Sequence, residues 1–122
     1  MTTQEGNKLI AEFMGWKIGR NLPGDIRFQT NWFDTDGLRK GAYLQFDNSW
    51  DWLMPVVEKI HHMGCIIEID YSLVTSCRIC VIGKKEQKAF NLVADNNGGH
   101  ESIYAVWLSI IKFIEWYNTQ KP

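Results

Sequence analysis

Residues 102–118, with the sequence S-I-Y-A-V-W-L-S-I-I-K-F-I-E-W-Y-N, decide how this chain folds. Their large apolar side chains recur at offsets of three and four, which is the spacing of one face of an α-helix. That face consists of Ile103, Val106, Trp107, Ile110, Ile111 and Ile114, with Phe113 and Tyr117 at its margin. Burial of one such side chain contributes about 2 kcal/mol. The helix therefore requires a large apolar surface from the rest of the chain.

The composition is that of one globular domain spanning residues 1–122, with 45% hydrophobic and 22% charged residues. The net charge of −1 gives the whole molecule no electrostatic attraction for nucleic acid or an anionic membrane. Such binding would require a local basic patch. Six tryptophans and six phenylalanines exceed what a minimal core needs, which indicates that some rings lie at a partner surface.

The location is expected to be the cytosol. No apolar run approaches the ~20 residues of a spanning helix, and residues 1–20 lack the apolar segment of a signal peptide. Three cysteines cannot all pair within the chain, which favours a reducing compartment. We therefore expect a cytoplasmic protein without membrane association.

Two further helices are expected. Thr2 or Thr3 can cap the first helix, whose apolar face is formed by Leu9, Ile10, Phe13 and Met14 and which ends at Gly15. Asn48-Ser49 opens the second helix, which runs to about Met63. Pro55 removes one backbone hydrogen bond, so this helix either bends there or begins nearer Asp51.

Three strands are predicted between the second and last helices, at Cys65–Tyr71, Ser76–Ile82 and Ala89–Ala94. Their short connections predict an antiparallel meander. The strands carry apolar residues on both faces, which favours helices on both sides. The predicted fold class is α+β: an antiparallel meander sheet of three or more strands packed by three helices in a helix–sheet–helix sandwich.

Residues 19–47 are open to two interpretations. Ile26 to Phe33 alternate in polarity, 34–37 has turn composition, and Tyr43–Phe46 would return as a partner strand. An irregular loop is the alternative. The same turn, D-T-D-G, has the first letters of a calcium loop but lacks its later ligands, which favours a plain turn.

Three blocks of the sequence are similar to one group of proteins. They are N-K-L-I-A-E-F-M-G-W at 7–16, S-W-D-W-L-M-P-V-V-E-K-I at 49–60, and residues 101–118 with A-V-W-L and I-E-W-Y-N. In this order they resemble small phage and prophage proteins of the alpha-beta-alpha sandwich type. The resemblance implies a sandwich fold and an origin in a mobile element, and it carries over no catalytic residues.

By class alone, in size and lack of motifs, the chain also resembles inhibitors of host defence such as anti-CRISPR proteins. That likeness implies a host protein or ribonucleoprotein as partner and the host cytosol as location.

Catalytic and metal sites are weaker interpretations. His61, His62, Cys65, Cys77 and Cys80 are zinc-type ligands, but positions 77 and 80 of one strand face opposite ways, which favours buried or half-buried thiols and no metal or cofactor. Asp70, Glu86 and Lys88 are similar to the D…(E)xK pattern of restriction-type nucleases, with magnesium as the implied ion. However, Asp70 ends the first strand, whereas that family expects an aspartate on the second.

A small RNA- or DNA-binding module is the remaining alternative, because the element order resembles a double-stranded RNA-binding domain. The expected lysine cluster before the last helix is replaced by the acidic and amide-rich residues 95–101. The basic patch would instead be Lys84, Lys85 and Lys88, for which a solvated turn is the simpler interpretation.

We predict a non-enzymatic protein with a partner-binding surface of aromatic and basic residues. Leu108 and Trp116 fall off the apolar face of the last helix, and Trp32 and Phe33 point opposite ways along the predicted hairpin. Cover by the first helix is the alternative for these side chains. The predicted binding residues are Trp32, Phe33, Arg39, Lys40, Lys84, Lys85, Lys88, Leu108 and Trp116.

Overall fold

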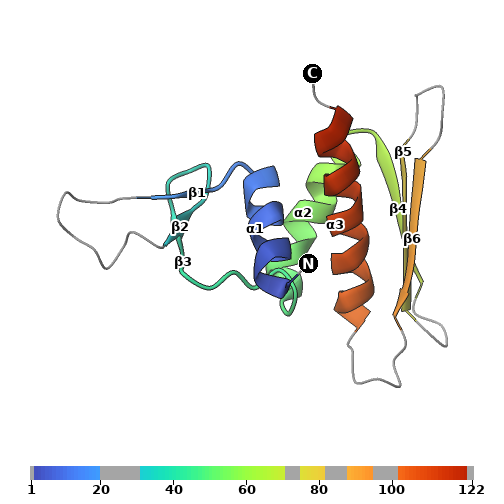
Figure 1. Ribbon diagram of the computed structural model, residues 1–122, viewed down its shortest axis with the longest axis horizontal. Helices are drawn as coiled ribbons and strands as arrows, with labels where there is room; N and C mark the ends of the chain where they lie inside the picture. Colours follow the sequence, from blue (N-terminus) through green and yellow to red (C-terminus); the bar gives the residue numbers. More distant parts are fainter. Residues whose placement is uncertain (1, 20–30, 71–74, 82–87, 95–101, 121–122) are drawn as a thin grey trace. The chain divides into compact units, whose positions relative to one another are not determined.

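The computed structural model describes residues 2–19, 31–70, 75–81, 88–94 and 102–120 (Figure 1). The chain forms two compact units, unit 1 (Met1–Gln45) and unit 2 (Phe46–Pro122). A single domain over residues 1–122 stays a prediction. In chain order the elements are α1(Thr3–Phe13), β1(Lys17–Ile18), β2(Trp32–Phe33), β3(Arg39–Gly41), α2(Trp50–His62), β4(Cys65–Asp70), β5(Thr75–Val81), β6(Lys88–Ala94) and α3(Ser102–Gln120).

The sheet of unit 2 is an antiparallel meander with the strand order β4-β5-β6. Its pairing runs without a shift from Cys65↔Val81 to Asp70↔Ser76 and from Thr75↔Ala94 to Val81↔Lys88. Each strand lies within one residue of its predicted bounds. The α+β class with a three-stranded antiparallel meander is therefore confirmed.

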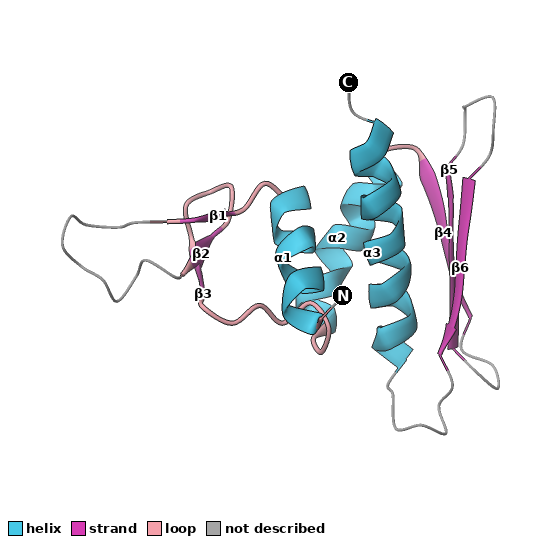
Figure 2. Ribbon diagram, in the orientation of Figure 1, coloured by secondary structure: helices cyan, strands magenta, loops and turns pink. Residues whose placement is uncertain are grey.

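Both helices of unit 2 lie on one face of this sheet (Figure 2). α3 contacts β5 and β6, and α2 contacts β4. Along β5, Cys77 and Ile79 are buried whereas Arg78 between them is exposed, so only one face is covered at these positions. Unit 2 is thus a helical layer on a sheet, and neither α2 nor α3 supplies the second helical layer of the predicted sandwich.

The apolar face of α3 is the core of unit 2. All six predicted stripe residues are buried, and so is Phe113, which the periodicity placed only at the margin. The buried Ser109 hydroxyl donates a hydrogen bond to the Cys77 carbonyl oxygen at 3.2 Å. This bond ties α3 to the central strand and satisfies the buried Ser109 hydroxyl.

α2 contains a proline in its interior. The helix runs from Trp50 to His62 with Pro55 inside it, and Ser49 is its N-cap without a side-chain hydrogen bond. The missing proline N–H leaves one backbone carbonyl without its usual partner. Gly64, with φ +91°, takes the left-handed conformation that ends the helix just after Met63.

Unit 1 contains α1 and a small sheet with the order β1-β2-β3. Thr2, one of the two predicted caps, is the N-cap of α1, and its hydroxyl accepts a hydrogen bond from the Glu5 N–H at 3.1 Å. β1 was not expected, and it pairs antiparallel with β2. Of the predicted strand from Ile26 to Phe33, β2 contains Trp32 and Phe33, and positions 26–30 lie outside the described residues.

The predicted partner strand Tyr43–Phe46 is wrong, because the return strand is Arg39–Gly41. The turn after β2 closes tightly: Asp34 N–H donates to the Leu38 carbonyl at 3.0 Å, and Gly37 N–H donates to the Asp34 carbonyl at 3.0 Å. Pairing therefore begins directly after Leu38. Gly41 then adopts φ +98°, which ends the strand before Tyr43.

Truncation of the α3 core tests this packing. We expect Ile110→Ala to lower the free energy of unfolding by about 2–5 kcal/mol, because the fully buried side chain leaves a cavity. Lys112→Ala on the exposed side of the same helix is the control, with a change of about 0.5 kcal/mol or less. Urea unfolding followed by circular dichroism measures both, and equal effects would contradict the assigned core face.

Candidate binding site

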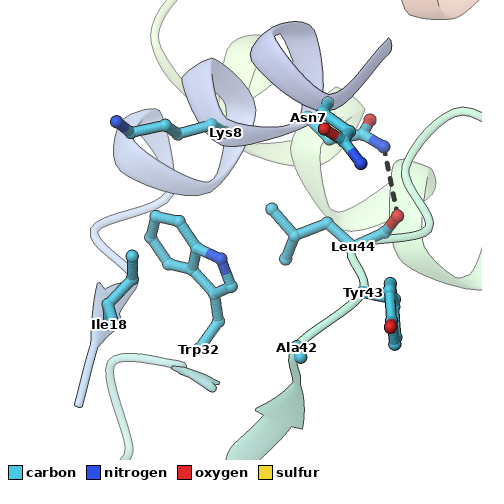
Figure 3. Close-up of a pocket in the computed structure, with 8 residues that line it drawn as sticks. Asn7, Lys8, Ile18, Trp32, Ala42, Tyr43 and Leu44 are labelled. Carbon is cyan, nitrogen blue, oxygen red and sulfur yellow. Dashed lines mark hydrogen bonds between the residues drawn. The ribbon is translucent and has the colours of Figure 1, made fainter. Parts of the chain in front are cut away.

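Unit 1 encloses a pocket of about 370 Å³ between α1, β1, β2 and the segment after β3 (Figure 3). We call it the Trp32 pocket. Its lining residues are Gln4, Asn7, Lys8, Ile18, Trp32, Ala42, Tyr43 and Leu44. Figure 3 shows the Trp32 indole between the side chains of Ile18 and Leu44.

The indole has a fixed position because Trp32 is paired on both sides. Trp32 pairs with Ile18 of β1 and with Gly41 of β3. It is only 7% exposed, although it belongs to a strand of two residues. The ring thus forms a rigid apolar wall of the pocket, which differs from the freely exposed anchor that the sequence suggested.

A buried amide fixes the opposite wall. Asn7 is 4% exposed, and its Nδ2 donates a hydrogen bond to the Leu44 carbonyl oxygen at 3.1 Å. An unpaired buried amide would cost about 1–3 kcal/mol, so this bond holds the segment 42–44 against α1. Residues 42–44, which follow β3, are therefore held in place by the Asn7 side chain of α1 and not by strand pairing.

Large apolar side chains surround the pocket in exposed positions. Tyr43 is 82% exposed, Leu38 62% and Ile18 52%, the highest values among the large apolar side chains of the described residues. Two of these three line the Trp32 pocket. Exposed apolar side chains grouped at a pocket are typical of a protein-binding surface.

The described residues of the pocket lining carry one formal positive charge, on Lys8, and no carboxylate. The Lys8 ammonium lies 4.0 Å from the Glu12 carboxylate, one turn further along α1. An exposed i,i+4 pair of this length contributes only a few tenths of a kcal/mol. Lys8 can therefore exchange this partner for an acidic group on a ligand at little cost.

Phe33 lies on the other side of β2, as the strand alternation predicted. It lines a second pocket of about 490 Å³ together with Gly15, Lys17, Gly19, Asp34, Thr35 and Gly37. The Phe33 ring covers Gly19 so closely that a Cβ atom there would lie 2.4 Å from its Cδ2. The glycine thus makes room for the ring, and Phe33 is half-buried.

The predicted basic residues Arg39 and Lys40 make contacts inside unit 1. Arg39 Nε donates to the Asn31 side-chain oxygen at 3.2 Å. The Lys40 ammonium lies 3.8 Å from the Asp34 carboxylate and 5.5 Å from the centroid of the Trp16 ring. Both side chains therefore help to hold the small sheet together, and their part in partner binding stays a prediction.

The segment 34–37 is a turn, as predicted, and its first carboxylate shapes it. Asp34 Oδ1 accepts hydrogen bonds from the backbone N–H groups of Asp36 and Leu38, both at 2.9 Å. Gly37 adopts φ +84°, a conformation that a side chain would disfavour. The Asp34 carboxylate is thus used in an Asx turn that positions β3 beside β2.

The Asp34 carboxylate can be tested locally. We expect Asp34→Ala to speed amide hydrogen exchange at Asp36 and Leu38 and to destabilise unit 1 by about 1–3 kcal/mol, because two N–H groups lose their acceptor. Asp34→Asn keeps an acceptor oxygen and should retain most of the protection. Asp36→Ala is the matched control. Unchanged exchange in Asp34→Ala would contradict this role.

The remaining predicted binding residues belong to unit 2. Leu108 and Trp116 of α3 are half-buried, and the Trp116 ring centroid lies 6.0 Å from that of Phe113. Lys88 begins β6, whereas Lys84, Lys85 and the predicted turn that contains them lie outside the described residues. Four of the nine predicted residues thus lie in unit 1 and five belong to unit 2, two of the latter outside the described residues, and their common surface stays a prediction.

The cysteines have the environments expected of structural thiols. Cys65 and Cys77 are buried and Cys80 is half-buried, all as free thiols. Cys77 shares its covered face with Ile79, and the strand alternation places Cys80 on the other face, as predicted for positions three apart. In the described part of the chain, no three histidine, cysteine, aspartate or glutamate residues are grouped so that they could hold a metal ion.

Thiol labelling can check this arrangement. Burial raises the pKa of Cys77, an effect that a hydrogen bond with Ser109 partly offsets. At pH 8 the Cys77 thiolate is therefore scarcer than that of an exposed cysteine, and iodoacetamide should alkylate Cys80 first and Cys77 last. Peptide mass spectrometry measures the order, and guanidinium should abolish it. Early alkylation of Cys77 would contradict its burial.

The nuclease-like residues are separated by the register of the sheet. Asp70 pairs with Ser76 at one end of β5, and Lys88 pairs with Val81 near the other. Five strand positions span about 17 Å, whereas magnesium ligands lie about 2 Å from the ion. Asp70 and Lys88 therefore do not share one metal site, and Glu86 lies outside the described residues.

Three residues that define the site, Asn7, Ile18 and Tyr43, are not among the nine residues predicted from the sequence. A signal existed for Asn7, which lies three and seven positions before Ile10 and Met14 and so shares the apolar face of α1. Lys17–Ile18 is too short for any periodicity to appear. Tyr43 falls in a segment that the sequence left open between a strand and an irregular loop, and its exposed position was not predicted.

Comparison with known proteins adds no assignment, because no family model, curated protein or solved structure matches this chain. None of the described helices is long and apolar enough to span a membrane. The candidate function therefore rests on the geometry of the Trp32 pocket and its exposed apolar neighbours.

Proposed function

We propose that this chain is a non-enzymatic binding protein that docks a partner macromolecule on unit 1. The single observation behind the proposal is the grouping of exposed apolar side chains, Ile18 and Tyr43, around a pocket whose Trp32 wall is rigidly held. Exposed apolar groups cost free energy in water, and a partner that covers them recovers it. Aromatic residues of this kind are frequent hot spots of protein–protein contacts.

The chemistry of the lining supports binding over catalysis. The Trp32 pocket is lined by apolar, amide and aromatic side chains, and its titratable groups are those of Lys8 and Tyr43. The described lining offers shape and hydrogen bonds, and its side chains do not include the paired acid and base of most hydrolytic sites.

The partner we propose is a host protein or ribonucleoprotein, and most concretely a CRISPR-type defence effector in the host cytosol. This finer proposal draws support from the similarity of residues 7–16, 49–60 and 101–118 to small phage and prophage proteins. The predicted basic residues Arg39 and Lys40 lie in the same unit as the pocket. They would add charge contacts at the edge of the interface.

A site-specific cross-link tests the docking surface. The photoreactive residue p-benzoylphenylalanine replaces Tyr43 in one variant and Met63, an exposed residue of unit 2, in another. We expect irradiation in host cells to give a discrete adduct from position 43 only. The captured partner is then purified and its affinity is measured against the unmodified chain.

The affinity measurement decides the proposal. We expect Ile18→Ser with Tyr43→Ser to weaken binding about 30-fold or more, as loss of hot-spot side chains does. Met54→Ser with Met63→Ser in unit 2 is the matched control and should leave the affinity unchanged. If the partner is a CRISPR effector, its cleavage activity should fall with the unmodified chain and recover with the unit 1 variant. Equal affinity for both double variants would reject unit 1 as the docking surface.

A further inference from the structure

We infer that the Trp32 pocket takes an acidic peptide segment, with a large apolar side chain in the pocket and a neighbouring carboxylate on Lys8. This inference rests on the proposed function and adds the chemistry of the partner segment. It follows from three properties of the pocket: its volume, the apolar surfaces in its walls and the charge of Lys8.

The volume sets the size of the group that enters. At about 370 Å³ the pocket is near the lower end of the range for ligand sites, about 300–1,000 Å³. It accommodates one or two large side chains rather than a dinucleotide or another extended cofactor. One anchor from a protein segment suits this volume.

The walls set the polarity of that group. Trp32, Ile18 and Leu44 present apolar surface to the pocket, and the Asn7 amide is engaged by the Leu44 carbonyl (Figure 3). Against the aliphatic surfaces of Ile18 and Leu44, an entering polar side chain would lose its water without gaining a partner, which is unfavourable. An aliphatic or aromatic side chain has no hydrogen bonds to water to give up, and it gains free energy by burying apolar surface.

The charge of Lys8 determines which peptide residue is favoured next to the apolar anchor. Among the described residues of the lining, Lys8 is the one with a formal charge, and Figure 3 shows its side chain extending toward the Ile18 end of the pocket. Its present partner, Glu12, is at the 4.0 Å limit of an ion pair and both side chains are exposed. A carboxylate next to the anchor therefore complements the pocket, and a lysine or arginine there would be repelled.

The test uses the full chain and three fluorescein-labelled peptides. The first contains Asp-Leu-Phe-Glu between glycine and serine spacers, the second has both acids replaced by lysine, and the third has both apolar residues replaced by serine. We expect the first to bind about 30-fold tighter than the third, because the anchor is lost. It should bind about five-fold tighter than the second, which is the range of an exposed ion pair.

Variants of α1 identify Lys8 as the source of the charge preference. Lys8→Gln should remove the difference between the acidic and lysine peptides, and Lys8→Glu should invert it. Glu12→Gln frees Lys8 of its internal partner and should tighten the acidic peptide about two-fold. Lys17→Glu, an exposed lysine that lines the other pocket, is the matched control. Fluorescence anisotropy gives the affinities, and thermal unfolding confirms that each variant is folded.

The outcomes separate this inference from the function it rests on. A shift of the Trp32 indole N–H signal with the acidic peptide, together with the Lys8 inversion, supports the inference. If no peptide binds, or if the acidic and lysine peptides bind equally, the inference is overturned even when the Tyr43 cross-link captures a partner. If the peptides show the expected preference but no cross-link forms, the pocket chemistry stands and the proposed host partner is rejected.

Discussion

Burial of the α3 stripe against β5 and β6 is the interaction on which unit 2 depends. The stripe residues are covered, and the buried Ser109 hydroxyl on that side bonds to the Cys77 carbonyl of the central strand. At about 2 kcal/mol for each buried large side chain, this contact outweighs any single hydrogen bond in the unit. The regular register of β4, β5 and β6 follows, because a shift by one residue would turn Cys77 and Ile79 away from the helix.

Unit 1 is held together in a different way, because its strands of two and three residues bury little apolar surface. Hydrogen bonds from side chains to backbone groups take the place of the strand-to-strand hydrogen bonds that longer strands would form. The Asn7 amide holds Leu44, the Asp34 carboxylate holds Leu38, and Lys40 connects the turn to the Trp16 ring. Each of these contacts fixes a loop at a defined place, so a small unit can present a pocket with rigid walls.

The difference in element length between the two units explains which helices and strands could be predicted from the sequence. All three helices and the strands of unit 2 were predictable, because each is long enough for a period of 3.6 or 2 to repeat. The strands of unit 1 were not, because two residues cannot show a period. Tyr43–Phe46 has strand composition, yet the Asx turn at Asp34 starts the pairing earlier and Gly41 ends it. Local turn chemistry overrode propensity there.

The site was only partly predictable for the same reason. Trp32 was identified as a large ring in an unusual place, but its pairing with Ile18 and its shared pocket with Asn7 depend on contacts between distant positions. These contacts have a functional consequence. A loop that must order on binding loses conformational free energy, whereas a wall fixed in advance by Asn7 and the sheet does not. Unit 1 thus uses its polar side chains for positioning and leaves Ile18 and Tyr43 exposed, which is the division expected of a preformed docking surface.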